Sequence, residues 1–354
     1  MLELIFSSLT STVILFSFGE LFQKIFFKNR NKNLKIIENG IFGCIFLSFI
    51  ILIINFFLPI NKIIGDLILL IGIIYFLKLL THQFNKLKLL ELLLFVTIFT
   101  LILIYGSNIS RPDAGLYHIP YTKIIQEEKI ILGLANIHHR FGHVSILQYL
   151  SSAYNNHLFN SEFLTIPIAS LFSFYFYFII KLFFSNIDNS LKKNFSFFII
   201  IIFSFYAFNR YSNYGNDAPT HLFFFLTIIY LIKIKDFRKI DLENFFIITI
   251  LSIFCFTNKT FSLINLLIPV ILFYYLKKKT SLKKIIINKK ALICLIFVSG
   301  WIIKNLLISG CFIYPISKTC FSSLKFSDID KTINVAIEGE AWAKNINNEE
   351  AQKI

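Results

Sequence analysis

The chain has 354 residues, of which 56% are hydrophobic and 44 are phenylalanine, and its mean hydropathy is +0.70. This composition excludes an ordinary soluble protein, because a soluble fold of this length has too little interior to bury so much apolar surface. The net charge of +15 is explained by membrane topology and contact with anionic lipids. The sequence shows no interleaving of basic and aromatic residues of the kind that would indicate nucleic-acid binding.

Ten apolar segments, each of about the length that crosses a bilayer, follow one another along the chain. In lipid every backbone polar group must be hydrogen-bonded within the protein, and these segments lack the alternation of β-strands, so we predict helices. The expected fold is an all-α integral membrane protein with about ten transmembrane helices and a large extracytoplasmic loop that carries juxtamembrane helices. The expected spans are about 3–23, 37–58, 64–81, 89–107, 162–182, 194–209, 218–234, 243–257, 260–276 and 291–309.

Basic residues gather in every second connection between these spans, most densely in the lysine-rich connection 277–290. Short cytoplasmic loops of membrane proteins are enriched in Lys and Arg. We therefore expect these connections in the cytoplasm and the N-terminus outside, in a bacterial inner membrane that the chain crosses several times. Four polar features then share the extracytoplasmic face, namely 111–143, 209–217, Asn258–Lys259 and everything after Ser309.

The segment 111–143 concentrates ionisable residues between two apolar spans and holds four of the chain's seven histidines. Prolines punctuate its first half, 121–131 has the pattern of a short amphipathic helix, and Gly133 ends that pattern. Apolar residues at helical spacing over 144–154 predict a second short helix. We expect both helices to lie at the membrane surface.

Sequence motifs carry a resemblance over about 105 to 345. They are DAGLYHIPYTKII, GLANIHHRFG, GNDAP, FTNKTFSL, GWIIKNLLISGCFIYP and AWAK, in this order. Together they resemble an uncharacterised family of multi-spanning bacterial membrane proteins. More distantly, the architecture is similar to GT-C glycosyltransferases, which take a sugar from a polyprenyl-phosphate carrier on the extracytoplasmic face. The resemblance implies three N-terminal spans (1–88), a GT-C-like membrane module (89–309) with an outer loop (108–161), and an extracytoplasmic C-terminal segment (310–354) that reads as truncated.

The implied function is transfer of a sugar from a polyprenyl-phosphate donor to a cell-envelope glycan or lipid, with membrane lipids as further partners. Asp113 matches the essential acidic position of these enzymes, and we expect it to act as a base or to hold a divalent cation, Mg or Mn. His118 is the second catalytic candidate. Cations are needed to hold the departing phosphate, and the substrate-binding candidates are Tyr117, His138, Arg140, Arg210, Asp217, Lys259 and Lys304.

Each of these assignments has a simpler alternative. Asp113 is also a good helix N-cap, interfacial histidines often bond only to backbone, and Lys259 or Lys304 can extend along the membrane surface towards lipid headgroups. A transporter or flippase for an envelope lipid, a polysaccharide polymerase and a structural scaffold are the alternative functions. Cys311 and Cys320 would both lie outside, where they can pair if the compartment is oxidising.

Overall fold

The computed structural model describes residues 2–27, 32–81, 86–106, 113–159, 164–186, 191–206, 210, 214–215, 217–234 and 236–345. Over these residues the secondary structure is helical, without a β-sheet, as the apolar segments predict. Arg111, Pro112, Asn209 and Asn216, which belong to the expected outer connections, lie outside the described residues.

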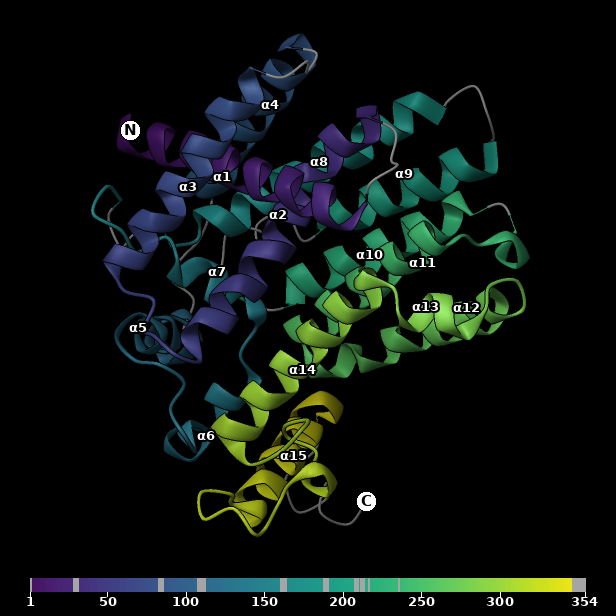
Figure 1. Ribbon diagram of the computed structural model, residues 1–354. Helices are drawn as coiled ribbons and strands as arrows, with labels where there is room; N and C mark the ends of the chain where they lie inside the picture. Colours follow the sequence, from purple (N-terminus) through teal and green to yellow (C-terminus); the bar gives the residue numbers. More distant parts are fainter. Residues whose placement is uncertain are drawn as a thin grey trace.

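Seven helical segments in the described part of the chain are long and apolar enough to cross a membrane. They are α1 (Leu2–Phe26), α2 (Lys32–Asn55), α3 (Lys62–Leu80), α4 (Lys86–Tyr105), α8 (Ile166–Asn186), η6 (Thr260–Leu266) continued by α12 (Leu267–Lys277), and α14 (Lys289–Ser309). Figure 1 shows these helices with the C-terminal segment at one end of the molecule.

Three further helices correspond to the remaining expected spans, namely α9 (Leu191–Tyr206), α10 (Asp217–Lys233) and α11 (Leu242–Asn258). They have 16 or 17 residues, which at 1.5 Å per residue is shorter than a hydrocarbon layer of about 30 Å. The helices are therefore where the sequence predicts them, and the count of about ten crossings stays a prediction.

Helices α1 and α2 pack with their backbones in direct contact, because glycines lie where they meet. A Cβ atom on Gly19 would lie 1.6 Å from the carbonyl oxygen of Asn39, and one on Gly43 would lie 1.8 Å from that of Leu15. Small residues allow such close approach between membrane helices. This pair of helices is the centre of the core, and α3, α4 and α8 pack against α1.

Polar side chains are buried within this core. Asn39 donates to Glu20 at 3.0 Å and accepts from Gln23 at 2.7 Å. Nearby in sequence, Glu38 accepts a hydrogen bond from Tyr230 of α10 and lies 3.8 Å from Lys233. We call these six residues the closed cluster, because the side chains of Glu20 and Glu38 are only 7% and 1% exposed.

The chain between α4 and α8 forms a series of short helices. They are η1 (Ala114–His118), α5 (Ile119–Glu127), α6 (Leu134–Ile137), η2 (His139–His143) and α7 (Ile146–Ser152). Gly133 has the left-handed backbone conformation, with φ of 67°, at the start of α6. The expectation of two surface helices differs from the structure at α7, because all seven of its residues are buried among α2, α5, α8 and α11.

The C-terminal segment begins where α14 ends at Gly310. A disulfide joins Cys311 to Cys320 and closes a short hairpin that contains η7 (Ser317–Thr319), and α15 (Ile329–Lys344) follows. Side-chain bonds to the carbonyls of Tyr314 and Phe326 join the segment to η6 and α6. The remaining short helices are η5 (Phe237–Lys239) and α13 (Leu282–Ile286).

Candidate functional site

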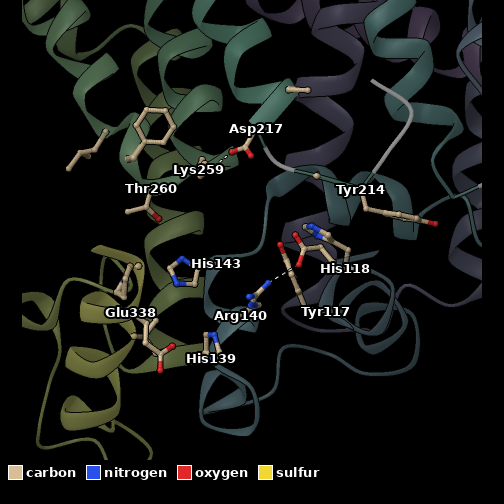
Figure 2. Close-up of a pocket in the computed structure, with 18 of the residues that line it drawn as sticks. Tyr117, His118, His139, Arg140, His143, Tyr214, Asp217, Lys259, Thr260 and Glu338 are labelled. Carbon is tan, nitrogen blue, oxygen red and sulfur yellow. Dashed lines mark hydrogen bonds and ion pairs between the residues drawn. The ribbon is translucent and has the colours of Figure 1, made fainter. Parts of the chain in front are cut away.

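A pocket with a cavity volume of about 1370 Å³ opens where four distant parts of the chain meet. Its lining residues fall within 113–143, 210–218, 259–267 and 315–339. Each of these ranges includes part of one of the four polar features that we expect from the sequence on one face. Figure 2 shows their side chains around one cavity, with Asp217 and Lys259 on one side and Tyr117, His118 and Arg140 on the other.

The first charged pair in the pocket joins Asp113 to Arg140. Oδ1 of Asp113 lies 2.8 Å from Nη1 of Arg140, and the guanidinium lies 5.1 Å from the ring centre of Tyr117. Asp113 occupies the N-cap position of η1 but makes no side-chain capping bond. The capping alternative for Asp113 is therefore not what the structure shows, since its carboxylate faces Arg140 instead.

The second charged pair joins Asp217 in the first turn of α10 to Lys259, which follows the last residue of α11. The positions suit the helix dipoles, because a carboxylate is favoured at a helix N-terminus and a cation at a C-terminus. The side chains of Asp113 and Asp217 are 58% and 49% exposed. Exposed pairs of this kind contribute only about 0 to 1 kcal/mol, so a ligand can separate them at little cost.

Arg140 and Lys259 line the same pocket although they are far apart in the chain. Both cations are held near carboxylates but remain open to the cavity. A phosphate can therefore replace the carboxylate as partner, with Arg140 able to bind two oxygens and Lys259 acting as a point charge. Tyr117 and Arg210 also line the pocket.

Two histidines of the pocket are neutral at pH 7. Burial lowers the pKa of His118 to about 4, and burial together with nearby cations lowers the pKa of His143 to about 4. The ring of His143 meets the ring of Tyr314 edge-on, with 5.1 Å between their centres. Gly142 is needed beside them, because a Cβ there would lie 2.4 Å from the Tyr314 ring.

A buried hydrogen-bond network connects the two sides of the pocket. Ser145 caps α7, and its hydroxyl donates to the side-chain oxygen of Asn258 at 2.7 Å. Gln148, also in α7, bonds to Nδ1 of His118 at 2.9 Å. Because Asn258 directly precedes Lys259, this network fixes the position of one charged pair relative to the other.

Two predicted binding residues lie away from the pocket lining. Nδ1 of His138 accepts the backbone N–H of Arg140 at 3.2 Å, so it acts as the cap of η2. Lys304 is fully buried in α14, 3.6 Å from the ring centre of Trp301, and its amine has no hydrogen-bond partner among the described residues. Lys304 therefore neither lines the pocket, as predicted, nor extends towards lipid headgroups, as the simpler alternative proposed.

Several pocket residues were not predicted, including Tyr214, Glu338 and the pocket-supporting Gln148. A glutamine inside the apolar pattern 144–154 was a usable signal, since a buried polar side chain requires a partner. Glu338 carried no such signal, because it lies on α15, whose polar residues resemble those of any exposed helix.

The described residues contain no group of three or more His, Cys, Asp or Glu side chains placed to hold a metal ion. Asp113, the predicted metal ligand, instead forms an ion pair with the guanidinium of Arg140. The donor set therefore does not fit the expected Mg or Mn site, and we derive no step through a metal.

The family model described as "Domain of unknown function (DUF8201)" matches residues 1–352, and the chain belongs to this family. No curated protein and no solved structure matches the chain.

Proposed function

We propose that the protein is a membrane glycosyltransferase that moves a sugar from a polyprenyl-phosphate carrier to a cell-envelope glycan or lipid. The observation that carries the proposal is the pocket, where two half-exposed carboxylate–cation pairs from three of the four lining segments surround one cavity. A reaction that needs a base and a cation clamp for phosphate finds both here.

The reaction assigns different roles to the two members of the first pair. When Arg140 binds the donor phosphate, it leaves Asp113, whose carboxylate then takes the proton of the acceptor hydroxyl. The acceptor oxygen forms a bond to the anomeric carbon of the sugar as the bond from that carbon to the phosphate oxygen breaks. Arg140 and Lys259 stabilise the negative charge on the departing polyprenyl phosphate.

Apolar side chains beside the pocket suit a lipid carrier. Phe261, Ile264 and Leu267 line the pocket, and each is more than half exposed. They lie on η6 and the start of α12, a segment apolar enough to cross a membrane. A polyprenyl chain in the bilayer can contact this face while its phosphate reaches Lys259.

The proposed orientation places the pocket outside a bacterial inner membrane, with a GT-C-like arrangement of about ten crossings and the N-terminus outside. The basic loops support it, and so does the disulfide beside the pocket, since disulfides persist in oxidising compartments. Cysteines introduced at Ser322 and Lys283, with Cys44, Cys255 and Cys294 replaced, test it in intact cells. An impermeant reagent should label Ser322→Cys and spare Lys283→Cys, and equal labelling would overturn the orientation.

The activity is tested with purified full-length protein in liposomes that contain a radiolabelled polyprenyl-phosphate sugar and envelope acceptor lipids. Asp113→Asn should lower sugar transfer by at least about 100-fold, because an amide cannot act as a base. Asp217→Asn is the matched control with a milder loss. Normal transfer by Asp113→Asn would remove the proposed role, and movement of intact donor across the bilayer without transfer would favour a flippase.

A further inference from the structure

His118 and Gln148 are both buried beside the pocket, each with 2% of its surface exposed. Nδ1 of His118 lies 2.9 Å from Nε2 of Gln148. A neutral imidazole carries its proton on one nitrogen and accepts at the other, so this contact identifies the tautomer once the donor is known. The surroundings of Gln148 identify the donor.

The side-chain amide of Gln148 has one orientation that satisfies both of its ends. Its Oε1 accepts the backbone N–H of Ser145 at 3.0 Å, within the capping box that begins α7. A backbone N–H can only donate, so the amide oxygen faces Ser145 and the amide nitrogen faces His118. Gln148 therefore donates, Nδ1 of His118 accepts, and the proton of the neutral ring is on Nε2.

The support of Gln148 is itself rigid. The hydroxyl of Ser145 accepts the backbone N–H of Leu147 at 3.1 Å while it donates to Asn258 at 2.7 Å. Asn258 in turn donates to the carbonyl of Phe254 in α11 at 2.6 Å. Each polar group in this series of hydrogen bonds can act only as the donor or only as the acceptor that its partner requires. The side-chain amide of Gln148 is therefore fixed in one of its two orientations.

Nε2 of His118 is left with a proton and no acceptor. Within the described ranges no hydrogen bond to Nε2 is found, while Nδ1 is occupied. The side chain lines the pocket although it is almost fully buried. Nε2 is not among the fully buried side-chain atoms that lack a partner in the described residues, so its N–H is open to the cavity, and an occupant of the pocket can accept from it.

We propose that Gln148 is a positioning residue that holds His118 as a neutral donor, and that Nε2–H of His118 binds a phosphate oxygen of the ligand. The identity of the ligand rests on the proposed function. His118 is then a binding residue and not a base, because neither nitrogen of the ring has a free lone pair. Proton removal is left to Asp113.

The charged groups that face His118 are Asp113 beside η1, Arg140 of η2 and Asp217 of α10. The two carboxylates raise the pKa of His118 and Arg140 lowers it, but burial is the largest effect and the pKa falls to about 4. The ring is therefore neutral throughout the range from about pH 5 to 8, in which an ordinary histidine changes charge.

The tautomer is measured by nitrogen NMR on full-length protein with labelled histidine in lipid nanodiscs, with His118→Asn used to assign the signal. We expect the proton on Nε2, and a shift of that signal when farnesyl phosphate is added but not when farnesol is added. A proton on Nδ1, or the same response to the phosphate and the alcohol, would overturn the inference.

Gln148→Glu tests the role of Gln148. A carboxylate at 148 accepts from Nδ1–H, so the proton of the neutral ring moves from Nε2 to Nδ1, and the pKa of His118 rises. Farnesyl phosphate should bind about tenfold or more weakly at pH 8, as expected for a lost hydrogen bond to a charged group, and tighten as the ring is protonated at lower pH. Gln126→Glu, a buried glutamine of α5, is the matched control and should show neither change.

The outcomes separate the inference from the proposed function. A chain that binds farnesyl phosphate through Nε2–H of His118 but transfers no sugar contradicts the glycosyltransferase and supports the inference. A chain that transfers sugar with the His118 proton on Nδ1 supports the glycosyltransferase and contradicts the inference. Unchanged binding and pH dependence in folded Gln148→Glu would overturn the positioning role.

Discussion

Each end of α10 contributes a residue to a carboxylate–cation pair, and the two pairs lie in opposite environments. Asp217, at the first turn, pairs with Lys259, and its side chain is 49% exposed in the pocket. At the last turn, Tyr230 and Lys233 contact Glu38, whose side chain is 1% exposed. The 17 residues of α10 separate the two ends by about 24 Å.

The difference between these ends lies in access and not in chemistry. Glu38 and Glu20 accept hydrogen bonds from Tyr230 and Asn39, and the side chains of both glutamates are almost fully buried. Asp113 and Asp217 each face a cation that also faces a large cavity. The carboxylates at one end are therefore enclosed by the fold, whereas those at the other end remain available to a ligand.

The largest effect on stability is expected from Gly19→Ala, in the packed core beside the closed cluster. The new methyl group would overlap the backbone of Asn39, so α1 and α2 must move apart, at a cost of about 3 kcal/mol or more. Gly115→Ala in η1 is the control, because nothing lies within 4 Å of its Cβ position. Unfolding in detergent measures both, and equal losses would contradict the contrast between a packed core and an open pocket.

The pocket should make stability depend on pH through His118. Its pKa falls from 6.5 unfolded to about 4 folded, so the unfolded chain binds more protons between these values. Stability is then complete above about pH 6.5 and is lost as the pH falls towards 4, by roughly 3 kcal/mol. His118→Asn should remove this part of the acid sensitivity, and an unchanged pH profile of unfolding in that variant would contradict the burial of a neutral ring.

Tyr230→Phe should have a smaller effect, at the closed end of α10. The variant removes the hydroxyl that donates to buried Glu38, which should cost about 2 kcal/mol, as expected for a hydrogen bond to a carboxylate. Sugar transfer per folded molecule should stay unchanged. Tyr274→Phe, on the exposed side of α12, should change stability by less than about 0.5 kcal/mol. A loss of transfer in Tyr230→Phe would show that the closed cluster also serves the reaction.

The apolar pattern alone predicted the helices, because their length and hydrophobicity depend on local sequence. The helices α9, α10 and α11 have only 16 or 17 residues each. Whether helices of this length cross the membrane is not a local property of the sequence, since tilt and neighbouring helices decide it. The polar loops predicted the pocket for a related reason. Charged groups avoid lipid, so those on one side of the membrane gather at one surface.

The role of a single polar side chain was harder to predict, because it depends on neighbours distant in sequence. Spacing could not show that His138 caps η2, or that packing around α14 buries Lys304. Gln148 acquires its role only when α7 is buried next to His118, 30 residues away in sequence. Arg140 and Asp113, 27 residues apart, were each predicted as site residues, but their pairing required the fold.

The most direct test compares Asp113→Asn with Glu38→Gln in one measurement, the initial rate of sugar transfer per folded molecule in liposomes. Both changes convert a carboxylate that faces a cation into an amide, one in the pocket and one in the closed cluster. We predict a loss of at least about 100-fold for Asp113→Asn and a rate within about twofold of wild type for Glu38→Gln. Similar rates in the two variants, whether both lost or both retained, would contradict the assignment of chemistry to the open pocket.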